Sequence, residues 1–158
     1  MKKLLSLLCA LPLLFLTSCD DVNDLPDVEI YFDISGGTII DGTIYIMRGE
    51  TLSVNGISVY NNDPGNVIIS GATYYWDGYL LGANPYRPFG FDIYIAPDTY
   101  PGLHTLAIEC PVYAEGKSGA TATSYIDVVV LNSYTELPVG GYPEPGVSVF
   151  PQIDYINY

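Results

Sequence analysis

The sequence predicts an all-β protein that folds as a single antiparallel sandwich of about seven strands. From Asp27 onward, apolar residues recur at every second position, and the 3.6-residue spacing of an amphipathic helix is nowhere sustained. Clusters of Gly, Asn, Asp and Pro separate these alternating stretches, as turns do. Because no segment has the length and pattern of a crossover helix, neighbouring strands are expected to be antiparallel.

The alternation assigns one inward face to each predicted strand. The residues expected to face inward are Val28, Ile30, Phe32, Ile34, Ile44, Ile46, Leu52, Val54, Ile57, Val59, Phe89, Phe91, Ile93, Ile95, Leu106, Ile108, Cys110, Val112, Ile126, Val128 and Val130. The parity changes at Asn55-Gly56, which predicts a β-bulge there. Asp77-Gly78 predicts a tight type I′ hairpin turn, because both residues tolerate positive φ angles.

Two stretches allow a family resemblance to be named. Trp76 ends a predicted strand just before a tight turn, and the later stretch PGLHTL, residues 101–106, opens another strand. Over roughly residues 27–131 the chain resembles bacterial immunoglobulin-like domains. The resemblance implies that Trp76 is the core tryptophan of the third strand.

The same resemblance implies roles for two residues near the start of the later strand. Leu106 stands where antibody domains place their second cysteine, and His104 stands where they place a hydrogen-bonded corner tyrosine. The chain departs from the family pattern because neither core cysteine is present and the usual aspartate lies further upstream, at Asp98. Such a fold implies no particular function.

The first nineteen residues have the pattern of a bacterial lipoprotein signal. Lys2 and Lys3 precede an apolar run from Leu4 to Leu16. As a helix this run would span roughly 20 Å, short of the ~30 Å hydrocarbon core of a bilayer, so it is an export signal rather than a membrane span. The run ends in LTSC, which resembles the lipobox. The resemblance implies that residues 1–18 are removed and that Cys19 carries lipid.

Lipid on Cys19 would fasten the protein to a membrane, since two or more acyl chains are enough for stable attachment. Residues 19–26 are expected to form a lipidated acidic tether. The run Asp20, Asp21 and Asp24 resembles the signal by which some Gram-negative bacteria move lipoproteins to the outer surface, and the alternative is a solvated tether without that role. The expected localisation is the outer membrane, exposed on the cell surface.

The cysteine content excludes an internal disulfide in the mature chain, and the net charge excludes nucleic acid as a partner. Cys9 belongs to the signal and Cys19 would carry lipid, so the mature chain keeps Cys110 alone and can form no internal disulfide. We expect Cys110 to be an inert buried thiol. Residues 19–158 contain three basic against eighteen acidic residues, hence a net charge of −15. Such a surface repels phosphate backbones, so nucleic acid is excluded as a partner.

The sequence does not favour an enzyme, and it predicts no metal or other cofactor. His104 is the only histidine, so a nucleophilic triad would need it, and the corner role is favoured instead. The aspartates at positions 20–27 could collect around calcium, but their spacing matches no calcium-binding loop. The stretch NNDPGN, residues 61–66, is rich in oxygen atoms, yet its composition is first of all that of a turn.

Tyrosines supply the main candidate binding surface. The assigned faces point six of them outward: Tyr31, Tyr45, Tyr75, Tyr94, Tyr113 and Tyr125. Tyr75, Tyr113 and Tyr125 fall on the third, sixth and seventh predicted strands, which are neighbours in one sheet of such a sandwich. Beside carboxylates such as Glu109 and Asp127, their rings could stack sugars or pack against a protein. The alternative is that tyrosine simply favours strands.

Two other aromatic stretches compete for a binding role. The loop GANPYRPFG, residues 82–90, offers Tyr86, Arg87 and Phe89 between prolines, or else covers the end of the core. The tail at residues 132–158 is rich in proline and tyrosine. It could be a linker, could lie along the domain, or could add a strand to the sheet of another subunit.

The sequence therefore favours a cell-surface lipoprotein that acts as a non-catalytic binding module for glycan or protein. The alternative is a structural subunit or spacer in a cell-envelope assembly, with the tail used for strand addition. A hydrolase of low activity is the third possibility.

The lipobox resemblance makes a prediction about Cys19. We expect Cys19 to be acylated and the Cys19→Ala variant to be released or mislocalised, because the acyl chains are the anchor. Mass spectrometry of the wild-type N-terminal peptide checks this directly, and an unlipidated Cys19 would refute the predicted anchor.

Overall fold

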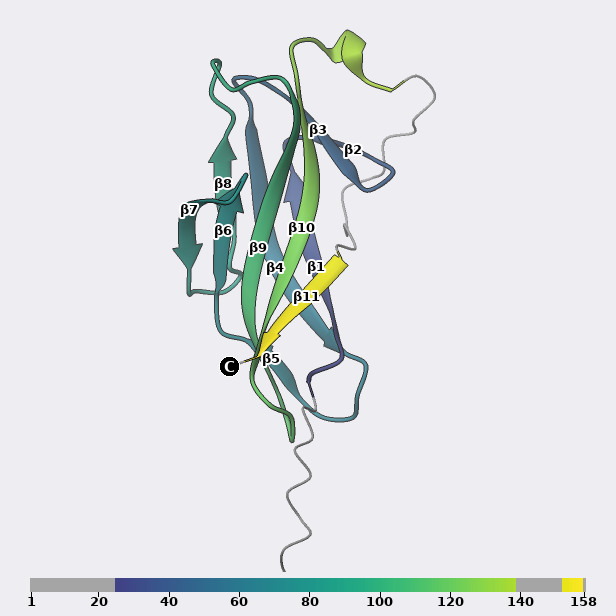
Figure 1. The fold of residues 1–158 in the computed structure, drawn as a ribbon, viewed down its shortest axis with the longest axis vertical. Helices are drawn as coiled ribbons and strands as arrows, with labels where there is room; N and C mark the ends of the chain where they lie inside the picture. The colour runs from purple at the N-terminus through teal and green to yellow at the C-terminus, as the bar shows by residue number, and fades with distance from the viewer. Residues whose placement is uncertain (1–24, 139–151, 158) are drawn as a thin grey trace, which may run out of the picture.

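The computed structural model describes residues 25–138 and 152–157. In these residues, eleven strands form two sheets packed face to face, a β-sandwich (Figure 1). No helix in this part of the chain is long and apolar enough to cross a membrane. The predicted signal peptide, Cys19 and the aspartates at positions 20, 21 and 24 lie outside the described residues.

Three strands form the smaller sheet and eight form the larger. The smaller sheet has the order β1 (Val28–Ser35), β4 (Thr51–Asn61) and β8 (Phe91–Tyr94). The larger sheet has the order β2 (Thr38–Ile40), β3 (Thr43–Met47), β10 (Ala120–Leu131), β9 (Gly102–Ala114), β6 (Ala72–Trp76) and β7 (Tyr79–Asn84). In addition, β5 (Val67–Ile69) pairs with β9, and β11 (Gln152–Asn157) pairs with β10. A 3₁₀ turn, Tyr134–Glu136, follows β10.

The expectation of a purely antiparallel sandwich of about seven strands is wrong in two respects. The larger sheet is mixed, because β3 runs parallel to β10 from the pair Ile44–Val128 to the pair Met47–Leu131. A parallel pair needs a long connection between its strands. Here the connection between β3 and β10 consists of strands of both sheets rather than a helix. The absence of a helical pattern in the sequence therefore did not exclude a parallel pair. The structure also has more strands than the seven expected, because short segments such as β2 and β5 form strands of their own.

The predicted inward face is the core of the sandwich. All the residues assigned to it are buried except Val59 and Phe91, which are half-buried and pack against the core. The alternation is clearest in β1, whose apolar residues are buried while Glu29 and Asp33 are exposed. Period-two patterning thus decided which side of each strand faces the other sheet.

Both predicted backbone features are present. Asp33 lies opposite Gly56 and Ile34 lies opposite Val54, so Asn55 is the extra residue of a β-bulge. Asp77 and Gly78 have φ angles of 49° and 81° and join β6 to β7 as a two-residue hairpin turn. The bulge returns Leu52 and Val54 to the buried face, as the change of parity required.

Tyr74, rather than Trp76, is the core aromatic residue of β6. Tyr74 is fully buried, its ring stacks on Phe91 with the centroids 4.7 Å apart, and its hydroxyl donates to the carbonyl oxygen of Phe89. Trp76 has the inward parity but ends the strand, where it is half-buried and stacks on His104 at 5.0 Å. The core-tryptophan assignment is therefore corrected, since Trp76 lies at the rim.

This arrangement predicts different costs for two substitutions in β6. Tyr74→Ala should lower the free energy of unfolding by about 3 to 5 kcal/mol, because it empties a fully buried site. Trp76→Ala should cost less, about 1 to 3 kcal/mol, because part of its surface is already hydrated. Urea unfolding curves of the two variants measure the difference, and a larger loss for Trp76→Ala would place the tryptophan in the core after all.

Candidate functional site

The outer face of the larger sheet places two of the predicted tyrosines on either side of one small residue. Ala107 of β9 lies opposite Tyr75 of β6 and also opposite Tyr125 of β10. Two strand spacings separate the tyrosine Cα atoms, roughly 10 Å. Both side chains project from the same face, with only the Ala107 methyl group between them. The register of three strands thus creates an aromatic pair around a shallow floor.

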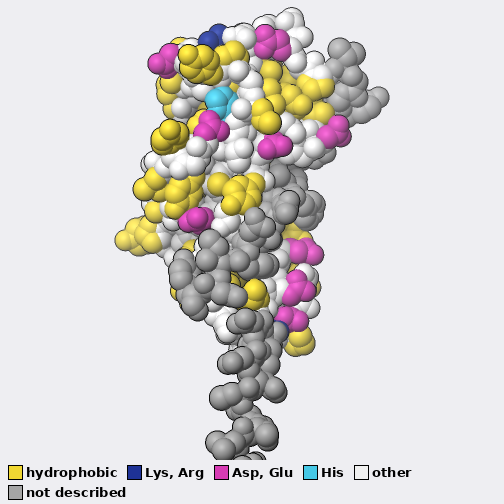
Figure 2. All heavy atoms as spheres, in the orientation of Figure 1, with side chains coloured by type: hydrophobic (Ala, Val, Ile, Leu, Met, Phe, Trp, Pro, Cys, Tyr) yellow, Lys and Arg dark blue, Asp and Glu magenta, His cyan; other side chains and the backbone are white. Residues whose placement is uncertain are grey.

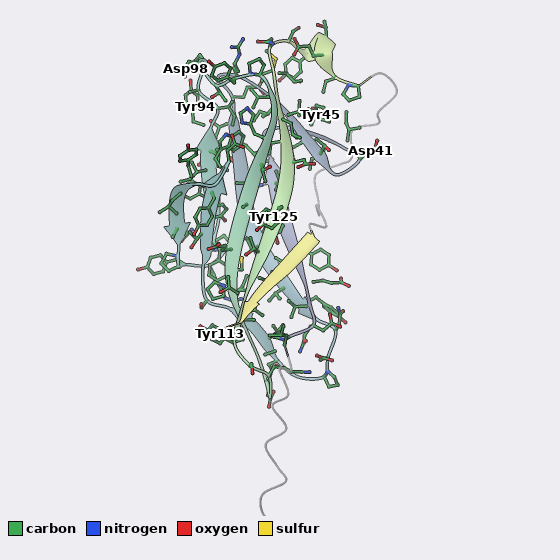
Figure 3. The ribbon with its side chains drawn as sticks, in the orientation of Figure 1. Asp41, Tyr45, Tyr94, Asp98, Tyr113 and Tyr125 are labelled. Atoms are coloured by element: carbon green, nitrogen blue, oxygen red, sulfur yellow. The ribbon has the colours of Figure 1, made fainter. Side chains whose placement is uncertain are left out.

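Leu80 extends this arrangement to the neighbouring strand, because it lies opposite Tyr75 on β7. We call Leu80, Tyr75, Ala107 and Tyr125 the tyrosine row. Leu80 is 65% exposed and Tyr125 is 47% exposed, while Tyr75 is half-buried. Hydrophobic side chains gather over β6, β7, β9 and β10 on this face (Figure 2), and Tyr125 lies near its middle (Figure 3).

Carboxylates flank the tyrosine row on both sides. Glu109 lies two residues beyond Ala107 on β9, and its Oε2 accepts a hydrogen bond of 2.9 Å from the Tyr75 hydroxyl. Asp127 lies two residues beyond Tyr125 on β10 and is exposed. Flat rings with hydrogen-bond acceptors beside them suit a ligand that has both apolar faces and hydroxyl groups.

Tyr113 does not belong to this group. It lies on the same face of β9 but six residues beyond Ala107, a distance of roughly 20 Å along the strand. Its cross-strand neighbour is Ile68 of β5, and both side chains are 50% exposed. Figure 3 shows Tyr113 toward the opposite end of the sheet from Tyr45. The predicted trio of tyrosines is therefore a pair and one separate residue.

The loop after β7 presents only part of its predicted binding set. Phe89 is 3% exposed and belongs to the core, so its assignment as a ligand contact is wrong. Arg87 covers it, with the guanidinium carbon 5.8 Å from the ring centroid, and the Ile57 N–H donates to the Pro88 carbonyl at 3.0 Å. Tyr86 is 77% exposed and Arg87 is exposed. The loop closes the core and leaves these two residues outside.

The described piece of the tail lies along its own domain, one of the three possibilities that the sequence left open. Strand β11 pairs antiparallel with β10, from Gln152 opposite Tyr125 to Asn157 opposite Ala120. Strand β3 pairs with the other part of the same edge, residues 128–131. The two strands therefore cover different stretches of the β10 edge beside the tyrosine row.

His104 is a hydrogen-bonded corner residue, as predicted. Its Nδ1 lies 2.7 Å from Oδ2 of Asp77, and its Nε2 lies 2.8 Å from the carbonyl oxygen of Tyr100. Both neighbours are acceptors, so both ring nitrogens must carry a proton for the two bonds to form together. Asp77 also accepts from the Thr105 N–H at 2.9 Å. The imidazolium thus ties the β6–β7 turn to the segment before β9.

The pKa values of this pair follow from the same contacts. Burial by itself lowers the pKa of His104, but the hydrogen bonds to Asp77 and Tyr100 and the nearby carboxylate charge raise it overall. Burial raises the pKa of Asp77, but the hydrogen bonds from His104 and Thr105 outweigh this effect and lower it overall. Each group favours the charged form of the other.

Cys110 is buried between the sheets, as predicted for an inert thiol. Burial raises the pKa of this thiol to about 12, with a smaller contribution from the charge on Glu109. The stretch NNDPGN is a turn, in which Asn61 accepts from the Asp63 N–H and donates to the Gly65 carbonyl, while Lys117 pairs with Asp63 at 3.1 Å. Among the described residues, no three His, Cys, Asp or Glu side chains gather as metal ligands.

No protein-family model matches the chain, and no curated protein matches its sequence. Among solved structures, the chain is similar to a structure described as fibronectin(III)-like modules of Clostridium thermocellum CbhA, with a TM-score of 0.37 and 16% identity over 61% of this chain and 94% of that chain. A likeness of this size carries no functional argument. Its own sheets and strand registers define the protein as a β-sandwich that carries the tyrosine row on one outer face.

The His104–Asp77 contact predicts a dependence of stability on pH. The raised pKa of His104 means that its contribution is complete below its ordinary value of 6.5 and is lost as the pH rises through the folded value. The lowered pKa of Asp77 means that its contribution is present above 3.8 and is lost on acidification through the folded value. Asp77 is 41% exposed, so the effect should be about 1 kcal/mol or less.

Asp77→Asn is the matched variant for this prediction, because Asn-Gly keeps the type I′ turn while removing the charge. Chemical unfolding of wild type between about pH 6 and pH 9 should show a loss of stability that Asp77→Asn lacks. Equal pH dependence in the two proteins would show that the contact does not hold the imidazolium.

Proposed function

We propose that this chain is a surface lipoprotein, anchored through Cys19, whose sandwich acts as a non-catalytic glycan-binding module. The tyrosine row is the observation that supports this proposal. It places two tyrosine rings, a methyl floor and the carboxylates of Glu109 and Asp127 on one face. A protein ligand for the same face is the alternative.

The chemistry of the face favours a neutral glycan. The apolar face of a sugar ring packs against a tyrosine ring, and its hydroxyl groups donate to carboxylate oxygens. Tyrosine supplies this contact at low conformational cost, because only two side-chain torsions must be fixed. The surplus of acidic residues repels anionic chains, so a neutral ligand fits better than a sulfated or uronic one.

The reactive side chains support a role without catalysis. The two ring nitrogens of His104 are engaged with Asp77 and Tyr100, which leaves neither available as a general base. The raised pKa of Cys110 keeps this buried sulfur a thiol rather than the thiolate that acts as a nucleophile. A hydrolase would need other groups on the outer faces.

The structural-subunit alternative has less support in the described residues. Strand addition to a neighbour would use the tail, but Gln152–Asn157 pairs with β10 of the same chain. A donated strand would first have to leave this position and give up those backbone hydrogen bonds.

Substitution of the tyrosine pair tests the proposal. The double variant Tyr75→Ala/Tyr125→Ala should stay folded and lose at least roughly tenfold in glycan affinity, because aromatic contacts dominate such surfaces. Tyr113→Ala is the matched control, since it removes an equally exposed ring from the same face at a separate position. Binding is screened on an array of neutral and anionic glycans and measured by calorimetry.

Two results would contradict the proposal. Wild-type protein that binds no glycan on the array would favour the protein-ligand alternative. Equal loss of affinity in the double variant and in Tyr113→Ala would show that the tyrosine pair is not the site.

A further inference from the structure

The free edge of the larger sheet at β7 is a second candidate interaction surface. We propose that two copies of this chain associate by antiparallel pairing of their β7 strands. In the described residues β7 pairs with β6 on one side, and no strand lies on its other side (Figure 1). Its backbone donors and acceptors on that side are therefore available to another strand.

The side chains of β7 are unusually apolar for such an edge. Tyr79, Leu80 and Leu81 are 78%, 65% and 40% exposed, and the remaining residues of the strand are Gly, Ala and Asn. The strand has six residues and carries no charge. A long, uncharged and apolar edge strand is a template for pairing with another chain.

Other edges in the described part of the chain are protected against such pairing. Strands β2 and β5 are only three residues long. Strand β1 presents Glu29 and Asp33, and β8 has four residues that include Asp92. The edge of β10 is occupied by β3 and β11, and β11, which pairs with β10 alone, contains Asp154. Short length, charge and cover are three of the usual protections of an edge, and β7 lacks all three. Its one irregularity is a bulge at Leu81, which leaves Leu80 paired with Tyr75 and Gly82 paired with Tyr74.

Charge complementarity at the two ends of β7 favours a second copy as the partner. The chain carries a net charge of −13, so two copies repel wherever their acidic surfaces meet, and an uncharged strand avoids this cost. Asp77 precedes β7 and Arg87 follows it. Antiparallel pairing about a two-fold axis therefore places Arg87 of each copy near Asp77 of the other copy, giving two equivalent contacts of opposite charge.

Arg87 is suited to this contact. Within the described residues its interaction is with the ring of Phe89 at 5.8 Å, and the salt bridges found there involve other residues. Its guanidinium is exposed at the end of the strand. A cation in this position gains a carboxylate partner only when the second copy docks.

Pairing would also enlarge the tyrosine row. Leu80 belongs to both surfaces, so docking of two β7 strands brings the rows of the two copies onto one continuous face. The edge itself is small compared with the roughly 800 Å² per partner of a standard interface, so the association should be weak and dependent on concentration.

Sedimentation equilibrium of residues 20–158, which include every described residue and omit the predicted signal peptide and lipidated Cys19, tests the proposal. Wild type should show a monomer–dimer equilibrium below about 1 mM protein, the weak end of specific association. Leu80→Lys and Leu81→Lys should raise the dimer dissociation constant by roughly tenfold or more, because a lysine on an edge strand opposes pairing and each variant adds one cation from each copy near the two-fold axis. Ile68→Lys, which adds the same charge at a 50% exposed position on β5, should leave dimerisation unchanged.

Cysteine cross-linking identifies the strand that docks. Under mild oxidation, the double variant Leu81→Cys/Ala83→Cys should form a disulfide-linked dimer, because the register that brings Arg87 opposite Asp77 also brings position 81 of one copy opposite position 83 of the other, within bonding distance. The buried Cys110 gives little background, and Ile68→Cys is the control.

Three outcomes would overturn the proposal. The first is a wild-type chain that stays monomeric to about 1 mM. The second is a dimer that persists in both lysine variants while circular dichroism shows them folded. The third is cross-linking of Ile68→Cys as efficient as that of the β7 double variant.

Discussion

The register between β9 and β10 is the constraint on which the rest of the structure depends. These strands pair without interruption from Val112 opposite Ala120 to Gly102 opposite Val130. Side chains alternate between faces, so a shift of one residue would move the buried set into solvent and Tyr125 into the core. Cys110 is the one cysteine of the described residues, so the register there is held by burial of apolar side chains rather than by a disulfide.

The tyrosine row and the β7 edge both follow from this register. Because Ala107 lies opposite Tyr125 on one side and Tyr75 on the other, the aromatic pair exists only in this alignment. Strand β6 in turn positions β7 through the Asp77-Gly78 turn, which the imidazolium of His104 ties to the segment before β9. Glycan binding and edge pairing are therefore proposed for neighbouring parts of one sheet face.

Much of the fold could be predicted from the sequence because alternation and turn chemistry are local properties. The inward faces, the bulge at Asn55 and the Asp77-Gly78 hairpin all follow from residues close together in the chain. Leu80 could also have been placed beside Tyr75, since a two-residue turn fixes the register of its hairpin. Leu80 is aliphatic, however, so the aromatic and charged pattern that predicted the binding surface does not include it.

The remaining features depend on distances that local patterns do not contain. The alternation of side chains correctly predicts that Trp76 points inward. Whether an inward side chain is covered depends on how far the opposing sheet extends, and Tyr74 is fully buried whereas Trp76 is not. The sequence allowed two places for Phe89, since alternation assigned it to the core and its loop suggested a ligand contact. The structure places it in the core, where its ring helps to close the sandwich. Tyr113 and Tyr125 are separated because of the register between β9 and β10. That register could not be predicted from the sequences of the two strands.

The register is tested most directly by measuring which side chains surround the Ala107 methyl group in solution. In a methyl-labelled sample, nuclear Overhauser spectra should show contacts from Ala107 to the rings of both Tyr75 and Tyr125, because directly opposed Cβ atoms lie about 4.5 to 5.5 Å apart. Ala107→Ser would assign the methyl signal. Contacts from Ala107 to core residues such as Leu52 or Ile126 would instead show that the register is shifted and that the tyrosine row does not exist.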